Sequence, residues 1–298
     1  MRIGITGATG FIGSALGRKA VEHGHEIVAF SRRPDLSLSF ASEVRRIHDH
    51  GVALDVTGLD ALVHLAGESV MGLWTGAKRK RIRESRVVLT HRIVEALKNT
   101  PNGPATFICA SGSGAYGDGG DKMLTENQPF GSDFLARVCV DWETAAAQAE
   151  EAGIRVVNLR TGMVLGNGGG AWPFLKKLFS LRLGAQLGSG KQWVPWIHLN
   201  DEIGIILHAL ENPAYRGPVN LATPNPVTNA EMTKLIAQSL DRSTLPAVPG
   251  FVLKLLVRDL SSVVLSSQRV MPKTALSHGY VFEFPLFQDA LADLNAQP

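Results

Sequence analysis

The chain has 298 residues, of which 45% are hydrophobic and 19% charged, and its formal net charge is +3. These values are typical of a globular protein and give no electrostatic reason to expect a nucleic-acid or membrane partner. No apolar run has the length of a membrane span. Cys109 and Cys139 lack the spacing of a zinc site or a disulfide framework, and the first predicted strand leaves no room for a signal peptide. We therefore expect no metal and a cytoplasmic location, with an organelle matrix as the alternative.

The first predicted strand, residues 2–5, leads directly into a glycine-rich turn. Residues 6–13 read Thr-Gly-Ala-Thr-Gly-Phe-Ile-Gly and open a helical pattern of apolar residues. In this strand–turn–helix context the glycines predict the phosphate-binding turn of a dinucleotide fold. Gly7 allows the tight turn, Gly10 lets the backbone approach a pyrophosphate, and Gly13 lets the helix pack closely on the strand. The N–H groups at the start of the helix then face the phosphates.

Strands and helices alternate through the first half of the chain. We expect further strands at residues 26–30, 44–47, 61–65, 106–110 and 155–159, helices at 75–98 and 133–152, and a returning strand at 218–221. This order predicts an α/β protein with a Rossmann-like, doubly wound parallel sheet and a smaller C-terminal α/β substrate lobe.

The expected domains follow from a change of pattern beyond Gly162, where glycines and tryptophans cluster. We place the nucleotide-binding core at residues 1–245, with substrate-lobe segments inserted at about 163–215. A small extension, residues 246–298, completes the substrate lobe.

The residues after the second predicted strand indicate which dinucleotide is bound. The end of this strand meets the adenosine ribose, and NAD enzymes place an acidic residue there. This chain has Ser31-Arg32-Arg33 instead. A guanidinium pairs with the 2′-phosphate of NADP, whereas a carboxylate would repel it, so Ser31 and Arg32 predict NADP. Two solvated surface arginines are the alternative explanation.

Four short segments together resemble the extended short-chain dehydrogenases/reductases, the group that contains the nucleotide-sugar epimerases. They are residues 6–13, Leu65-Ala66-Gly67-Glu68, Ser111-Gly112-Ser113 and Tyr116-Gly117-Asp118. Further segments resemble the atypical, epimerase-like subfamily: Trp74, Ser85-Arg86, Asp133-Phe134, Cys139, Trp142-Glu143, Arg160-Thr161-Gly162, Val164-Leu165-Gly166, Gly188-Ser189-Gly190 and Trp196-Ile197-His198. That subfamily has its own C-terminal domain, whose signature is similar to Ser267-Gln268-Arg269-Val270 with Pro272.

The resemblance implies a set of cofactor-binding positions. They are Gly7, Thr9, Gly10, Phe11, Ile12, Ser31, Arg32, Leu65, Ala66, Arg86 and Val164. Gly13 joins them as part of the turn, and Gly67 joins them because it follows a strand at the edge where open α/β folds bind ligands. For Arg86, an ordinary surface charge is the alternative.

The chain lacks the catalytic pair of the hydride-transfer enzymes in this superfamily. Those enzymes carry Tyr-x-x-x-Lys on one helix, where the ammonium lowers the pKa of the phenol. No tyrosine of this chain has lysine four positions later. Leu135 and Cys139 stand at the two positions, and the resembled subfamily shares this departure. Ordinary dehydrogenase or epimerase activity is therefore in doubt.

Other hydroxyl groups are candidates for the catalytic role. Tyr116 follows the strand at 106–110, near the expected place of a substrate carbonyl, and Ser111 and Ser113 offer hydroxyl donors. For all three, shaping the loop is the alternative. Cys139 could be a nucleophile only if a nearby cation lowered its pKa. On a helix face with Leu135 and Trp142, it is expected to pack.

The glycine- and tryptophan-rich region supplies candidate substrate contacts. They are Trp172, Gln192, Trp193 and His198, with Lys191 beside them. Core packing is the alternative for the tryptophans, and a structural histidine is the alternative for His198.

A basic cluster, Lys78-Arg79-Lys80-Arg81 with Arg83 and Arg86, is expected to be a solvated helix face rather than a nucleic-acid site. The predicted function is an NADP(H)-binding, epimerase- or oxidoreductase-like protein acting on an unknown small carbonyl or nucleotide-sugar-like substrate. The alternative is a noncatalytic NADP(H)-binding sensor or scaffold. We expect a monomer or homodimer, without nucleic-acid or membrane partners.

Overall fold

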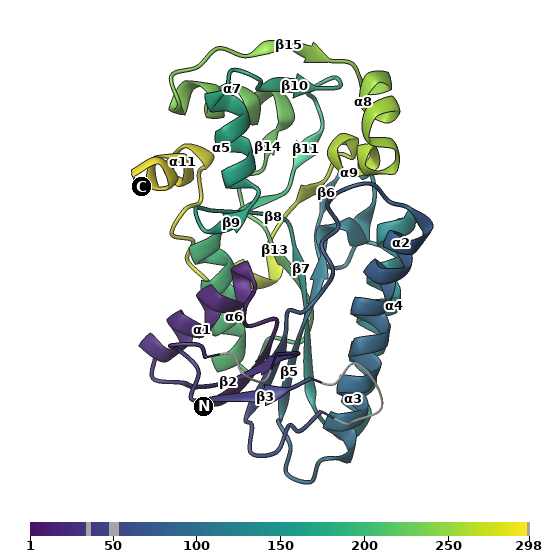
Figure 1. The fold of residues 1–298 in the computed structure, drawn as a ribbon, viewed down its shortest axis with the longest axis vertical. Helices are drawn as coiled ribbons and strands as arrows, with labels where there is room; N and C mark the ends of the chain where they lie inside the picture. The colour runs from purple at the N-terminus through teal and green to yellow at the C-terminus, as the bar shows by residue number, and fades with distance from the viewer. Residues whose placement is uncertain (34–36, 48–53, 297–298) are drawn as a thin grey trace.

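A seven-stranded sheet forms the lower part of the molecule (Figure 1). The computed structural model describes residues 1–33, 37–47 and 54–296. The strands are β1 Arg2–Thr6, β2 Glu26–Ser31, β3 Glu43–Arg46, β4 Ala61–His64, β5 Thr106–Gly112, β7 Arg155–Thr161 and β13 Gly217–Leu221. They are all parallel, in the order β13-β7-β5-β4-β1-β2-β3. The predicted Rossmann-like sheet is therefore confirmed, including the strand expected at 44–47.

Helices cover both faces of the sheet. On one face, α1 Phe11–Glu22 and α6 Leu199–Glu211 pack on apolar side chains such as Ile3 and Ile5. On the other face, α3 Leu89–Asn99 and α4 Phe134–Ala147 pack on residues such as Leu62 and Phe107. Because alternate residues of each strand point to opposite faces, a strand covered on both faces tends to be apolar along most of its length. This explains the continuous apolar runs of β2, β4 and β5, whereas the edge strand β3 reads Glu-Val-Arg-Arg and is only partly buried.

The helix predicted at 75–98 consists of three consecutive helical segments. They are α2 Gly76–Arg83, the π-helical turn η1 Glu84–Val88, and α3. The Thr75 side chain accepts a hydrogen bond from Lys78 N and caps the start. A π-helical turn inserts an extra residue into the helix and is often found at functional sites. Here it contains Arg86.

A smaller lobe lies above the carboxyl ends of the strands (Figure 1). Its core contains Leu165, Trp172, Trp196 and Phe287. Its helices are α5 Trp172–Ser180, α7 Asn229–Ser239, α8 Gly250–Val257, α9 Ser261–Leu265 and α11 Phe287–Ala296. Its strands are β8 Met163–Gly166, β9 Gly169–Gly170, β10 Ala185–Leu187, β11 Trp193–Val194, β12 Trp196–His198, β14 Val227–Thr228 and β15 Leu245–Val248.

Three short elements join the lobe to the sheet. Strand β6 Met123–Leu124 pairs with β16 Arg269–Val270 from the C-terminal extension, and α10 Lys273–Ser277 follows. This pairing brings the extension back to the segment that follows β5. Among the helices of the described residues, none combines the length and the apolar character needed to cross a bilayer.

Candidate functional site

The carboxyl ends of the parallel strands bring the glycine turn and several candidate residues together. Strands β1 and β4 are neighbours, and their following connections cross opposite faces of the sheet. Ligands of open α/β sheets bind at such a switch point. The glycine turn after β1 and the Leu65–Gly67 segment after β4 meet there.

The structure shows why two of the turn positions are glycine. Gly7 has φ +74°, and a Cβ there would lie 2.9 Å from the amide N of Ala66. A Cβ on Gly13 would lie only 2.2 Å from the carbonyl oxygen of Gly7. Gly10 is the N-cap of α1 and makes no side-chain cap hydrogen bond. The first N–H groups of α1 therefore lack a side-chain cap, as a phosphate site requires.

Phe11 links the glycine turn to the smaller lobe. Cβ atoms placed on Gly166, Gly169 and Gly170 would lie 2.7, 2.7 and 2.8 Å from carbon atoms of the Phe11 ring. The glycines of the hairpin formed by β8 and β9 thus leave room for the ring, which packs against their backbone. The Phe11 side chain is structural, so a contact of this residue with a cofactor would use its backbone.

The remaining predicted cofactor positions differ in exposure. Thr9, Arg32 and Gly67 are exposed, while Ile12, Leu65 and Ala66 are half-buried. Val164 is buried in β8, and its carbonyl oxygen accepts a hydrogen bond from Ala171 N. Ser31 Oγ at the end of β2 accepts a hydrogen bond from Arg33 N.

Behind the turn lies His64, which was not predicted as a site residue. Its Nδ1 lies 2.6 Å from Thr6 Oγ1, and the same hydroxyl accepts a hydrogen bond from Ala66 N. Complete burial lowers the pKa of His64 to about 3, so the ring is neutral. His64 thus ties the ends of β1 and β4 together below the turn. In the sequence, a histidine at the end of an apolar strand was the one feature that could have indicated this role.

Arg86 points inward from the π-helical turn. Its Nη1 donates to the carbonyl oxygens of Glu68 and Ile82, and its Cζ lies 5.1 Å from the centroid of the Trp142 ring system. A Cβ on Gly67 would lie 3.4 Å from this guanidinium, so the glycine leaves room for it. Burial lowers the pKa of Arg86, although a guanidinium stays charged near neutrality. A positive charge therefore lies beside the segment after β4.

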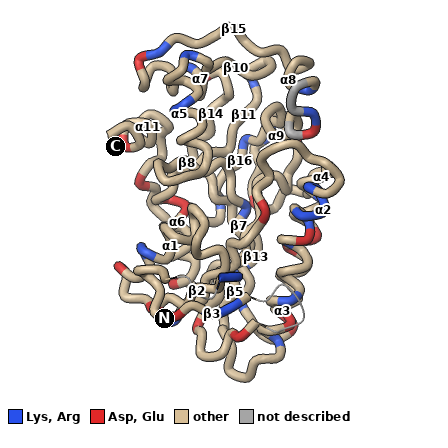
Figure 2. The backbone as a smooth tube through the Cα atoms, viewed as in Figure 1, with Lys and Arg blue, Asp and Glu red and all other residues tan. Residues whose placement is uncertain are grey.

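The other basic residues of the cluster are paired with acidic ones; Figure 2 shows basic and acidic residues next to each other around α2. The pairs are Lys78 and Arg81 with Glu68, Arg79 with Asp259, Lys80 with Glu84, and Arg83 with Asp141. Such a face has little net charge to offer a polyanion.

Tyr116 is built into a buried polar network. Its hydroxyl donates to Asn220 Oδ1 at 2.6 Å and accepts from Arg160 Nη1 at 3.0 Å. Burial raises the pKa of this phenol. The Tyr116 proton is shared with Asn220, so supplying a proton to a substrate would require this hydrogen bond to break, and the catalytic role of Tyr116 stays a prediction.

The two serine candidates differ from each other. Ser111 Oγ donates to Glu143 Oε1 at 2.7 Å, and Glu143 also forms a two-pronged ion pair with Arg160. Ser111 therefore belongs to the buried network. Ser113 begins the 3-10 turn η2 Ser113–Tyr116, and within the described residues its hydroxyl has no hydrogen-bond partner. Of the three hydroxyl candidates, Ser113 is the one still available to a ligand.

The helix α4 shows what replaces the missing catalytic pair. A Cβ on Gly114 would lie 3.3 Å from Leu135 Cβ, so Leu135 packs against η2. Burial raises the pKa of Cys139 to about 11, with Glu143 adding to the rise. The thiol is therefore protonated at neutral pH, and packing is confirmed over a nucleophilic role.

Three of the predicted substrate contacts have structural roles instead. Trp172 is fully buried in the core of the smaller lobe, which is the packing role given above as the alternative. Gln192 is buried and donates to the carbonyl oxygen of Leu187. His198 caps α6 by accepting from Asn200 N, and its Nε2 lies 3.3 Å from Asp293 Oδ2 of α11. Burial lowers the pKa of His198, which disfavours the cationic form. Trp193 remains half-buried.

Glu202 is a second residue that the sequence did not single out. It is fully buried on α6, and Thr161 Oγ1 donates to its Oε1 at 2.9 Å, while Oε2 has no hydrogen-bond partner in the described part of the chain. Burial raises its pKa to about 8. Its position beneath the end of β7 places a neutral carboxyl close to the carboxyl edge of the sheet.

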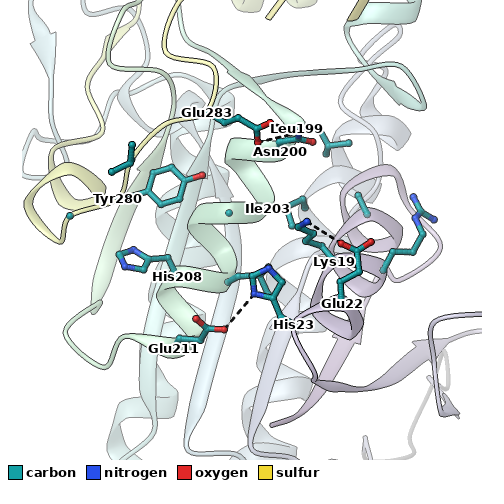
Figure 3. Close-up of a pocket in the computed structure, with 16 residues that line it drawn as sticks. Lys19, Glu22, His23, Leu199, Asn200, Ile203, His208, Glu211, Tyr280 and Glu283 are labelled. Carbon is teal, nitrogen blue, oxygen red and sulfur yellow. Dashed lines mark hydrogen bonds and ion pairs between the residues drawn. The ribbon is translucent and has the colours of Figure 1, made fainter. Parts of the chain in front are cut away.

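A groove of about 680 Å³ lies between α1 and α6, beside Tyr280 (Figure 3). Its polar residues largely pair among themselves, as with Lys19 and Glu22 or His23 and Glu211. None of the predicted cofactor, catalytic or substrate residues lines it. The groove is therefore separate from the candidate site. In the described residues, no group of three or more His, Cys, Asp or Glu side chains is arranged to hold a metal ion.

Comparison with known proteins identifies the family. Residues 3–222 match the NAD dependent epimerase/dehydratase family. The chain belongs to this family. Residues 248–294 match a domain of unknown function, DUF1731. Together these matches confirm the expected kinship with epimerase-like, atypical members that have a C-terminal domain of their own.

Two relatives and a solved structure extend over nearly the whole chain. The epimerase family protein SDR39U1 homolog, chloroplastic, of Arabidopsis thaliana is 36% identical over 98% of this chain and 86% of its own length. Human epimerase family protein SDR39U1 is 33% identical over 99% of this chain and 100% of its own. The crystal structure of human SDR39U1 (isoform 2) with NADPH has a TM-score of 0.88 at 31% identity and covers 100% of both chains.

More distant structures share the fold alone. UDP-glucuronic acid 4-epimerase from Bacillus cereus, in complex with UDP-glucuronic acid and NAD, has a TM-score of 0.76 at 18% identity. It covers 99% of this chain and 98% of that one.

We predict that Gly13→Ala destabilises the protein because the new methyl group would meet the Gly7 carbonyl oxygen. The expected loss is on the order of 1–3 kcal/mol, the usual effect of overpacking, measured by chemical denaturation. Gly76→Ala is the matched control: it also lies in a helix, but no atom lies within 4 Å of its added Cβ. Equal stabilities of the two variants would contradict the close packing of α1 on the turn.

We also predict a pH dependence due to Glu202. The carboxyl has a pKa near its ordinary value of 4.5 when unfolded and about 8 when folded, so its contribution to stability is full below pH 4.5 and is lost as pH rises to 8. Glu202→Gln should be more stable than the wild type at pH 8 and lose less stability between pH 5 and 8. Thermal melts would measure this, with the exposed Glu150→Gln as control. Identical pH profiles for both variants would refute the prediction.

Proposed function

We propose that this chain binds NADP(H) at the carboxyl edge between β1 and β4. The observation that carries the proposal is the geometry of the glycine turn, with Gly7 and Gly13 in close contact and the start of α1 left without a side-chain cap. The human relative crystallised with NADPH supports the same choice of cofactor. Gly7, Gly10, Gly13 and the backbones of Thr9, Phe11 and Ile12 would hold the pyrophosphate.

Ser31 and Arg32 would hold the adenosine end of the cofactor. The exposed Arg32 guanidinium is available for the 2′-phosphate, and no acidic residue stands beside it in the sequence. Leu65, Ala66 and Gly67 would border the middle of the cofactor. Val164 would border the nicotinamide end.

Arg86 supplies a cation where the family's usual lysine is missing. Cys139, at the lysine position, stays a neutral thiol near pH 7, because burial raises its pKa to about 11. The guanidinium could hold ribose or phosphate oxygens but cannot pass protons, because it does not deprotonate in proteins. Its role would therefore be binding and orientation.

We propose that the reaction is hydride transfer on a small carbonyl or nucleotide-sugar-like substrate, of the oxidoreductase or epimerase kind. When bound, NADP(H) supplies the hydride donor or acceptor. Ser113 would donate a hydrogen bond to a substrate carbonyl, while Ser111 and Tyr116 hold the surrounding network in place. Trp193 would border the substrate.

A noncatalytic NADP(H) sensor is the second candidate, and a specific observation favours it. Leu135 and Cys139 replace the proton relay, and the Tyr116 hydroxyl is already engaged. Turnover of NADPH with small molecules that co-purify with the protein, identified by mass spectrometry, separates the two candidates. NADPH binding without turnover in any fraction would favour the sensor.

The location and the assembly stay predictions. We propose a cytoplasmic monomer or homodimer, with residues 1–245 and 246–298 as core and extension. One relative is described as chloroplastic, so relatives do not all share one compartment. The paired charges around α2 support the proposal that nucleic acid is not a partner.

We predict that Arg32→Ala weakens NADPH binding at least tenfold and leaves NADH binding nearly unchanged. A charge-assisted hydrogen bond contributes about 1.5–3 kcal/mol. NADH has no 2′-phosphate and therefore makes no such hydrogen bond with Arg32 that the substitution could remove. Calorimetric titration with both dinucleotides measures the effect. Arg216→Ala is the control, because Arg216 is also exposed but precedes β13, at the opposite edge of the sheet. Equal losses for NADPH and NADH would show that Arg32 does not read the 2′-phosphate.

A further inference from the structure

Arg269 is half-buried, and within the described part of the chain its guanidinium has no hydrogen-bond acceptor. Its Cζ lies 4.6 Å from the centroid of the Trp193 ring system, and its Nε is buried without a hydrogen-bond partner. Across residues 1–33, 37–47 and 54–296, no carboxylate forms an ion pair with it and no carbonyl accepts a hydrogen bond from it. The cation–π contact with the Trp193 indole is thus the main interaction of the Arg269 guanidinium.

Other sheltered arginines of this protein are satisfied. Arg160 pairs with Glu143, Arg155 donates to four backbone carbonyl oxygens at and beyond the end of α6, and Arg86 donates to two. A sheltered charge without a counter-ion is costly. An anion bound to Arg269 would offset that cost.

The Arg269 side chain is held in place by its strand. Val270 is fully buried with Tyr116, Leu124 and Ala222. Because successive strand residues point to opposite sides, Arg269 points away from this cluster. Backbone contacts fix the strand to Trp193, whose carbonyl oxygen accepts from Gln268 N.

Trp193 is fixed as well. Its backbone N donates to Ser267 Oγ, and its indole Nε1 donates to Asp121 Oδ1 at 3.2 Å. The Asp121 carboxylate is therefore engaged by the indole rather than by Arg269. The result is a rigid aromatic platform under an unpaired guanidinium, and a guanidinium stacked in this way can present its N–H groups in the plane of the ring.

Hydrogen bonds connect the segment that carries Arg269 to the loop that follows Tyr116. Gln268 Nε2 donates to the carbonyl oxygen of Gly117, and Ser267 Oγ donates to that of Gly120. The segment 117–120 follows Tyr116 and η2 directly, and η2 begins with Ser113. Figure 2 labels β16 between the sheet and the smaller lobe.

We propose that Arg269 and Trp193 form an oxyanion-binding subsite, so that the substrate carries a phosphate or carboxylate group. This inference rests on the proposed function, because it assigns a chemical class to the substrate of the same site. A guanidinium fork binds either group through two parallel hydrogen bonds. The indole face holds the fork in position and shields the contact from water.

The test uses pyrophosphate and malonate as probes, titrated calorimetrically into the full chain with and without NADPH. Wild-type protein should bind at least one of them saturably, and Arg269→Ala should weaken that binding at least tenfold. Arg269→Lys, which keeps the charge but loses the fork, should fall between the two. The preferred probe shows whether the subsite favours phosphate or carboxylate.

Arg242→Ala is the matched control, because Arg242 is exposed beyond the end of α7 and carries the same charge. It should bind the probe as the wild type does. Equal probe affinities of Arg269→Ala and Arg242→Ala, or no saturable binding by the wild type, would overturn the subsite. If Arg269→Ala does not fold, Arg269→Lys replaces it in the comparison. A probe affinity of Arg269→Lys equal to that of the wild type would overturn the proposal.

The two proposals fail in different ways. NADPH affinity should be unchanged in Arg269→Ala, since Arg269 lies in the extension and not at the glycine turn. If the wild type does not bind NADPH, the proposed function is refuted. The probe titration without NADPH still tests the oxyanion subsite in that case.

Discussion

The buried ion pair between Arg160 and Glu143 is the interaction on which the candidate site depends. The two side chains are only 4% and 9% exposed, and two hydrogen bonds of 2.9 and 2.8 Å join them. Ser111, Tyr116 and the carbonyl oxygen of Glu126 also hydrogen-bond to the pair, which thereby holds β5, β7, η2 and α4 in one arrangement. Leaving one charge of such a pair without its partner typically costs about 3–5 kcal/mol. The network therefore constrains the shape of the carboxyl edge more strongly than any single apolar contact.

The same network decides which chemistry is available. In this protein the Tyr116 hydroxyl bridges Arg160 and Asn220, and Asn220 also donates to the carbonyl oxygens of Leu124 and Met271. A hydroxyl with these partners stabilises the junction between the core and the C-terminal extension. What remains at the edge is a positive charge on Arg86 and a hydroxyl on Ser113. These groups can bind and polarise, but they do not form the proton relay of the ordinary hydride-transfer enzymes.

The sequence predicted the sheet well because a strand buried on both faces is a short apolar run, and it predicted the turn because Gly7 and Gly13 have steric reasons that local spacing reveals. The roles of Tyr116, Trp172 and His198 were not predictable in the same way. Tyr116 and Asn220 are 104 positions apart in the chain. His198 caps α6 and approaches Asp293 of the last helix. The sequence pattern of an aromatic or polar residue near a glycine-rich loop is the same whether its side chain contacts a ligand or a distant segment of the chain.

The sequence by itself determined the α/β class, the order of the main strands, the glycine turn and the absence of a Tyr-x-x-x-Lys pair, because each depends on residues near one another in the chain. Only the tertiary structure decided which polar groups form hydrogen bonds or ion pairs within the protein and which are available to a ligand. The glycines at 166, 169 and 170 are explained by the Phe11 ring, which would collide with larger side chains there. The position of the Arg269 charge is explained by its stacking on Trp193. Burial and pairing are properties of the assembled molecule, and a charge or hydroxyl becomes functional only when no distant neighbour has already satisfied it.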